Sequence, residues 1–127
     1  MERPPQWLTS AVEAVLADLQ HPSPIPLEVS YAPLGGDQCW RVGVQEVAGY
    51  GTSFEADAED RDAGLHLHER LAWHLQQYLL LETRTAWGEG RPPCPGHQHP
   101  ASPSTSGEAL WICPRDGRVV ARIGKLA

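Results

Sequence analysis

Two short turns near the carboxyl end of the sequence constrain the fold most, because each carries side chains that bind metal ions. The first reads Cys94-Pro-Gly-His97 and the second reads Cys113-Pro-Arg-Asp116. Each turn has two residues between its donor side chains, which is the spacing that tetrahedral zinc sites favour, and each contains a proline that fixes one backbone angle. The sequence therefore predicts a zinc site within residues 91–127.

At these positions the segment resembles the zinc-ribbon family, in which two Cys-Pro-x-Cys-Gly turns, called knuckles, hold one zinc ion. Cys94 and Cys113 match the first ligand of each knuckle, and His97 matches a second ligand. Asp116 stands where the family has its fourth cysteine. The resemblance covers residues 91–127 and implies a zinc-bound β-hairpin there.

Four side chains are expected to bind the ion: Cys94, His97, His99 and Cys113. His99 follows His97 by two residues, and an imidazole nitrogen is a better donor for zinc than a carboxylate oxygen. Asp116 remains the alternative fourth ligand. Free or disulfide-bonded thiols are the competing interpretation of the cysteines, but this would leave two histidines at ligand spacing by coincidence.

Strand patterns flank the second knuckle. Residues 108–112 and 118–123 are expected to form two β-strands around the Pro-Arg-Asp-Gly turn, and residues 100–107 are expected to form a polar loop. A zinc ion at the base of this hairpin would tie both knuckles together, because so short a segment supplies little hydrophobic core. Trp111 is expected to pack on the same module.

Residues 1–90 are expected to form an α+β body, which begins with an amphipathic helix. Apolar residues recur there at three- and four-residue steps: Trp7, Leu8, Ala11, Val12, Val15, Leu16 and Leu19. Pro5 suits the first turn, and the prolines after His21 end the helix near Gln20. If the helix begins later, Ser10 and Glu13 could form a capping box.

A small antiparallel sheet is predicted after this helix, because the apolar period changes to two. Residues 27–31 and 40–44 alternate in this way on either side of a Gly-Gly-Asp turn, and a third strand is expected over residues 50–54. One face of the second strand carries Trp40, Val42 and Val44. Cys39 falls on the polar side and is expected to be a half-buried thiol rather than a ligand.

A long helix over residues 60–86 is expected to cross the sheet. The acidic stretch at residues 57–62 suits the positive end of the helix dipole. One apolar stripe should face the sheet, and it comprises Leu67, Leu71, Leu75, Tyr78 and Leu79. His74 lies at the edge of this stripe, where a hydrogen-bonded core histidine is expected rather than a catalytic one.

The same helix carries a second apolar ridge, formed by Trp73, Leu80 and Trp87, nearly opposite the first stripe. One sheet cannot cover both faces of a helix. The ridge is therefore expected to be covered in part by the first helix or the zinc module, or to contact a protein partner or a second copy of the chain.

No residue of the body forms a convincing catalytic group. His66 and His68 are two positions apart on a predicted helix and point in nearly opposite directions, so they cannot bind one ion. The sequence also has no phosphate-binding glycine loop, no nucleophile elbow and no Ser-His-Asp arrangement.

Charge is unevenly distributed along the chain. Residues 1–90 have 5 arginines and 14 acidic residues, a net charge of −9, whereas residues 91–127 have 4 arginines and one lysine against 2 acidic residues, a net charge of +3. Four basic side chains in the second part could contact a polyanion: Arg115, Arg118, Arg122 and Lys125. The acidic body would repel nucleic acid, which disfavours that interpretation.

The sequence has no apolar run of the roughly 20 residues needed to cross a bilayer and no signal-peptide pattern at its start. No membrane partner and a cytoplasmic location are therefore expected, and cysteines there stay reduced or bind metal. The abundance of Arg, Ala, Gly and Pro, with one Lys and no Asn, indicates a GC-rich bacterial source.

These patterns predict an α+β protein with an N-terminal helix, a small antiparallel sheet, a long helix and a C-terminal zinc-ribbon-like hairpin. Structural zinc in a protein-interaction or adaptor module is the favoured function, since four protein ligands close the metal to substrate. A nucleic-acid-binding zinc ribbon is the alternative. A zinc hydrolase or deaminase ranks last, because the module has few acids that could act as a general base.

Overall fold

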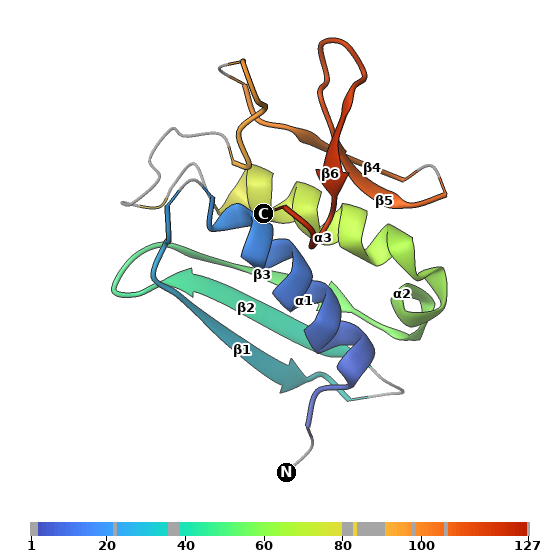
Figure 1. Cartoon of the computed structure of the whole chain (residues 1–127). Coiled ribbons are helices and arrows are strands. Elements are labelled where there is room, and N and C mark those ends of the chain that lie inside the picture. Colours follow the sequence, from blue (N-terminus) through green and yellow to red (C-terminus); the bar gives the residue numbers. More distant parts are fainter. Residues whose placement is uncertain are drawn as a thin grey trace.

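The computed structural model describes residues 3–21, 23–35, 39–79, 83, 91–97, 99–105 and 107–126. Helices and two antiparallel sheets place the chain in the α+β class, as predicted (Figure 1). The elements follow in the order α1 Gln6–Leu19, β1 Leu27–Pro33, β2 Trp40–Glu46, β3 Gly51–Ala56, α2 Ala58–Ala63, α3 Leu65–Tyr78, β4 Ser102–Thr105, β5 Ala109–Ile112 and β6 Val119–Arg122. None of the described helices has both the length and the apolar character that a bilayer crossing requires.

α1 begins and ends where the prolines require. Pro5 is its N-cap in an extended conformation, so the helix starts too early for a capping box at Ser10. The buried face comprises Leu8, Ala11, Val12, Val15, Asp18 and Leu19. Beyond the last turn, the Arg91 guanidinium donates to the carbonyl oxygen of Leu19 at 3.2 Å and to the hydroxyl of Ser23 at 3.0 Å. The end of α1 is therefore bonded to a distant part of the chain.

The first sheet has the order β1-β2-β3, with each neighbouring pair antiparallel, as the alternating pattern predicts. In β2 the buried positions alternate with exposed ones, and the buried apolar residues are Trp40, Val42 and Val44. Cys39 precedes β2 as a half-buried free thiol, which agrees with the expectation from its position.

The predicted long helix is wrong, because the chain breaks it at Gly64. Gly64 has φ +58° and ψ −111°, a conformation that residues with a Cβ rarely adopt, so the helix stops there and a new one starts. α2 precedes this break and α3 follows it. Of the predicted last part of the helix, residues 80–82 and 84–86 lie outside the described residues.

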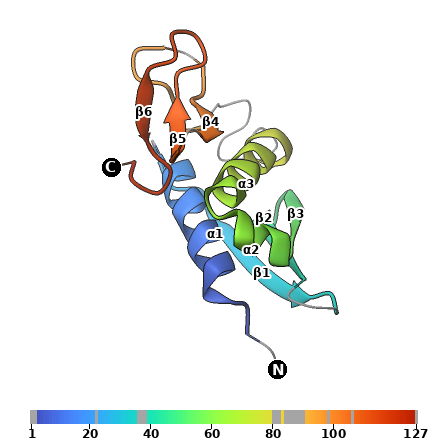
Figure 2. The ribbon, with the colours of Figure 1, turned by 90° about the vertical axis from the view of Figure 1, so that its right-hand side faces the viewer.

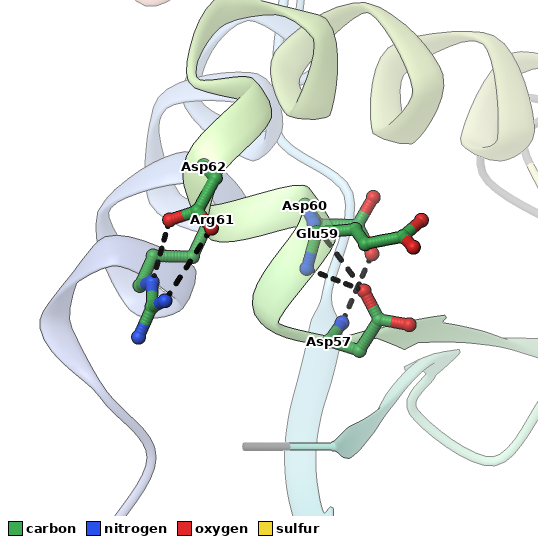
Figure 3. Close-up of polar contacts among 5 residues, drawn as sticks. All are labelled: Asp57, Glu59, Asp60, Arg61 and Asp62. Atoms are coloured by element: carbon green, nitrogen blue, oxygen red, sulfur yellow. Dashed lines mark hydrogen bonds and ion pairs between the residues drawn. The ribbon is translucent and has the colours of Figure 1, made fainter. Parts of the chain in front are cut away.

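The acidic stretch caps α2, in keeping with its predicted place at a helix start. Asp57 accepts hydrogen bonds from the backbone N–H groups of Glu59 at 2.9 Å and Asp60 at 3.3 Å, and its own N–H donates to the Asp60 carboxylate at 2.9 Å (Figure 3). This reciprocal arrangement is a capping box. Arg61 pairs with Asp62 on the exposed side.

α3 contacts both sheets, and α1 packs beside it (Figure 2). The buried side chains on and just after this helix are Leu67, Leu71, Ala72, Leu75 and Leu79. The helical spacing predicts that Tyr78 lies in the same stripe, but its side chain is 49% exposed. Its ring packs edge-to-face against Trp73, with 5.9 Å between centroids, so neighbouring aromatic residues share the solvent-facing side.

The C-terminal segment forms a three-stranded sheet of order β4-β5-β6. β5 and β6 pair antiparallel on either side of the second knuckle. β4 falls within residues 100–107, where Pro, Ser and Thr predict a loop, so that expectation is wrong. Pairing with β5 satisfies the β4 backbone, and this tertiary contact outweighs the weak local preference.

One hydrophobic cluster joins the N-terminal and C-terminal parts of the described chain. It combines residues of α1, the first sheet and α3 with Ala101, Ala109, Trp111 and Ile123. Trp111 is fully buried, and its indole N–H donates to Asp18 of α1 at 2.6 Å, so it packs on the body as well as on its own module. The division into a body of residues 1–90 and a module of residues 91–127 stays a prediction.

Candidate metal centre

The first knuckle is a tight backbone turn. The N–H of Cys94 donates to the carbonyl oxygen of His99 at 3.0 Å, and the N–H of His97 donates to the carbonyl oxygen of Cys94 at 3.0 Å. Gly96 has φ +80°, which allows the chain to reverse without the strain that a Cβ would cause. The turn therefore gathers three donor residues from one short segment.

The second knuckle connects β5 to β6. The N–H of Cys113 donates to the carbonyl oxygen of Arg118 at 2.7 Å, and the N–H of Gly117 donates to the carbonyl oxygen of Cys113 at 2.8 Å. The carboxylate of Asp116 accepts a hydrogen bond from the N–H of Arg118 at 2.8 Å. These bonds close the turn and fix Cys113 at its start.

Four donor atoms, one from each expected ligand, converge between the two knuckles. Nδ1 of His97 lies 3.5 Å from the sulfur of Cys94, 3.3 Å from the sulfur of Cys113 and 3.0 Å from Nε2 of His99. Nε2 of His99 lies 3.9 Å from the sulfur of Cys113. All four atoms lie within 4.8 Å of one another, so these residues are positioned to hold a metal ion.

Four of the six separations among these donor atoms lie near tetrahedral values, and the others lie within 4.8 Å. Zinc bonds of about 2.3 Å to sulfur and about 2.0 Å to nitrogen require about 3.5 Å between a sulfur and a nitrogen, and about 3.3 Å between two nitrogens. The four measured distances of 3.5, 3.3, 3.0 and 3.9 Å lie close to these values. Two thiolates would also cancel the charge of a divalent cation, which lowers the cost of holding it in a largely buried site.

One contact of His99 favours the tautomer in which Nε2 can bind a metal ion. Its Nδ1 lies 3.2 Å from the carbonyl oxygen of Pro100, and a carbonyl oxygen only accepts hydrogen bonds, so we assign the proton to Nδ1. Nε2 then keeps its lone pair, and Nε2 is the atom that lies near His97 Nδ1 and the sulfur of Cys113. Outer hydrogen bonds of this kind are usual for metal-binding histidines.

The two cysteines of the centre are buried free thiols, with Cys94 1% exposed and Cys113 fully buried. The disulfide considered from the sequence is therefore not formed in the described chain. Burial raises the pKa of the Cys94 thiol above its usual range, and neighbouring Cys113 adds to this effect, whereas the Arg118 guanidinium opposes it. A bound cation would stabilise the thiolate, so metal binding here would release a proton.

Asp116, the alternative fourth ligand, is exposed and does not belong to the converging group. Its pKa lies below the usual range, first because the N–H of Arg118 donates to it and second because the Cys113 side chain does so as well. In the structure this carboxylate closes the second knuckle, and His99 occupies the fourth donor position.

The four basic residues that could meet a polyanion have different surroundings. Arg122 forms an ion pair with Glu108 at 2.7 Å, and Arg118 donates to the carbonyl oxygen of Pro95 at 3.0 Å. The remaining two are exposed on the second knuckle and after β6: Arg115 and Lys125. Half of the predicted basic surface is therefore engaged within the C-terminal segment.

Of the predicted partner surface, the structure describes Trp73, which is 50% exposed. Leu80 and Trp87 lie outside the described residues. A cavity of about 330 Å³ adjoins Trp73 and is lined by Phe54, Glu69, Arg70, Trp73, His74 and Pro103. None of the four converging donors lines this cavity, so it is separate from the metal centre.

Two described histidines of α3 have polar partners. His66 pairs with Glu69 at 3.6 Å, and the half-buried His74 shares a hydrogen bond with the hydroxyl of Thr52 at 3.1 Å. Burial lowers the pKa of His74, which favours its neutral form. His74 is therefore a hydrogen-bonded histidine that supports packing.

Two residues that organise the C-terminal segment were missed from the sequence. Arg118 reads as part of a basic surface, although its backbone and side chain bond to both knuckles. Asp18 had a usable signal, because it is an acid on the apolar face of α1, beside Val15 and Leu19, where a buried polar partner should have been expected.

Comparisons of the chain with protein families, with curated proteins and with solved structures find no match. What the candidate metal centre can bind therefore follows from its own chemistry, the convergence of two thiols and two imidazoles.

Proposed function

We propose that the protein binds Zn²⁺ through Cys94, His97, His99 and Cys113, and that this ion is structural. The convergence of the four donor atoms within 4.8 Å carries the proposal. A set of two sulfur and two nitrogen donors is typical of structural zinc sites. Because protein donors fill all four positions, none is left for water or substrate, which argues against a hydrolase or deaminase.

In this proposal the ion joins the two knuckles, as in a zinc ribbon, and stabilises the outer part of the second sheet. A closed site shapes a surface rather than transforming a substrate, so we place the protein among interaction or adaptor modules. Trp73 and Tyr78 form an exposed aromatic pair that suits a protein partner or a second copy of the chain. Light scattering on the purified protein distinguishes a homodimer from binding to a different protein. A strictly monomeric protein would exclude the second copy as the partner.

Metal content tests the zinc site directly. The purified wild type is expected to contain about one equivalent of zinc, and Cys94→Ser and Cys113→Ser are expected to lose it, because a hydroxyl does not replace a thiolate as a zinc ligand. Cys39→Ser is the matched control, since Cys39 is half-buried outside the converging group, and it should retain the metal. Elemental analysis and zinc titration provide the measurement.

Two results would refute the site. One is a wild-type protein that neither carries zinc after purification nor takes up added zinc. The other is a Cys94→Ser, Cys113→Ser double variant whose zinc content equals that of the wild type while circular dichroism shows it folded.

A nucleic-acid-binding function is the second candidate, favoured by the exposure of Arg115 and Lys125 near the second knuckle and β6. The ion pair of Arg122 with Glu108 and the bond from Arg118 to Pro95 reduce the charge that is available for this role. Retention on heparin that falls steeply as salt rises would support it. Failure to bind heparin at low salt would eliminate it.

A further inference from the structure

Arg118 is bonded to both knuckles. Its carbonyl oxygen accepts a hydrogen bond from the N–H of Cys113 at 2.7 Å, within the second knuckle. Its guanidinium Nη2 donates to the carbonyl oxygen of Pro95 at 3.0 Å, within the first knuckle. Pro95 directly follows Cys94 in the sequence. Arg118 therefore bonds to the backbone of Cys113 itself and to the backbone of the residue next to Cys94.

The backbone of Arg118 is also held in place. The N–H of Arg118 donates to the carboxylate of Asp116 at 2.8 Å, which anchors the backbone on the knuckle. A guanidinium presents five N–H groups in a rigid fork, and the bond to Pro95 uses one of them. The bond to Pro95 also places this fork beside the residue that follows Cys94.

We propose that Arg118 is a positioning residue of the metal centre, which holds the first knuckle against the second and donates a hydrogen bond to Cys94 when that sulfur is a metal-bound thiolate. This inference rests on the proposed zinc site. Cys94 is 1% exposed, so water cannot solvate a thiolate there, and an N–H donor from the protein replaces it. Arginine suits this role better than lysine, because one fork can serve a carbonyl oxygen and a sulfur together.

Zinc affinity tests the inference, measured by competition with a chromophoric chelator at constant pH and ionic strength. Arg118→Gln is expected to bind zinc about tenfold more weakly, at the lower end of the effect of outer-sphere partners, because Arg118 is exposed. Arg118→Lys should fall between this variant and the wild type. Arg122→Gln is the matched control, since it removes a nearby arginine that pairs with Glu108, and its zinc affinity should equal that of the wild type.

A spectroscopic measurement separates the hydrogen bond to sulfur from simple bracing of the turn. In the Co²⁺-substituted protein, loss of a donor to the thiolate should move the sulfur-to-cobalt charge-transfer band of Arg118→Gln to lower energy. An Arg118→Gln affinity within twofold of wild type would overturn the inference. So would weaker binding with an unshifted band, because that pattern indicates bracing alone.

The two proposals can fail separately. A wild type that binds no zinc would sink the proposed function and this inference with it. A wild type that binds zinc tightly, together with an Arg118→Gln variant that is indistinguishable from it, would sink only the role of Arg118. Far-UV circular dichroism of each variant shows whether a change in affinity comes from a folded protein.

Discussion

Helices α1 and α3 and the first sheet bury mainly aliphatic side chains against one another, whereas the C-terminal segment attaches to α1 through buried polar groups. Asp18 is fully buried and accepts hydrogen bonds from the Trp111 indole at 2.6 Å and from the backbone N–H groups of Gly124 at 2.5 Å and Leu126 at 3.2 Å. Arg91, 1% exposed, donates to the end of the same helix. Both ends of the segment are thus bonded to the last turn of α1.

The difference shows how a short segment can be held in place with little core of its own. Among the described residues, it contributes Ala101, Ala109, Trp111 and Ile123 to the common cluster, and the half-buried Val120 packs against it. Hydrogen bonds to a charged group in a dry interior are strong and directional, so Asp18 and Arg91 compensate for the small apolar area. The two knuckle loops extend away from α1 (Figure 1). In the proposed function, the metal ion joins these two loops to each other.

The largest expected effect comes from removing the largest apolar side chain of the C-terminal segment, Trp111. Trp111→Ala should lower the free energy of unfolding by about 3–5 kcal/mol, because it leaves a cavity and removes a donor to buried Asp18. Trp73→Ala is the matched control, since Trp73 is 50% exposed, and it should unfold at nearly the wild-type urea concentration. Equal urea midpoints for the two variants would mean that the segment is not part of the common core.

The next largest effect is expected from the hydrogen bonds that join Asp18 of α1 to the C-terminal segment. Asp18→Asn keeps the shape but removes the charge and places an amide donor against N–H groups, so it should cost about 2–3 kcal/mol of stability. Asp62→Asn changes an exposed carboxylate on α2 and should leave stability unchanged. Urea denaturation measures both. If Asp18→Asn is as stable as the wild type, the attachment is held by apolar packing instead.

Metal removal should have the smallest effect on the whole molecule and a clear local one. A chelator is expected to speed hydrogen exchange at the N–H groups of Cys94 and Cys113, which bond within the knuckles, because the ion no longer joins the two turns. Exchange in α1 and α3 should hardly change, since their core does not include the metal donors. Global unfolding on chelation would show that the ion, rather than Asp18 and Arg91, holds the segment.

Much of the fold follows from local sequence patterns. The prolines before and after α1 place its ends, and the period-two pattern identifies the buried face of β2. The donor side chains could also be predicted, because Cys94, His97 and His99 lie within one turn and their spacing is a property of the chain itself. Cys113 was identified by the repeat of the Cys-Pro pair in a second turn.

Other features depend on partners that are distant in the sequence. The strand β4 exists because β5 pairs with it, and Tyr78 is exposed although the helical period places it in the apolar stripe. The break at Gly64 could not be predicted from the sequence, since a glycine within a helical pattern is also tolerated without a break. Local propensity is weaker than these tertiary contacts.

The sequence by itself indicated the helical period of α1, the alternation in β2 and the donor side chains of the two knuckles, because each of these patterns lies within a few residues. Only the tertiary structure decided that His99 rather than Asp116 joins the donor group, that Trp111 bonds to Asp18, and that Arg118 spans the knuckles. The bond between Trp111 and Asp18 joins residues 93 positions apart. Such contacts form only after the chain has folded, because their geometry depends on how the helices and both sheets pack together.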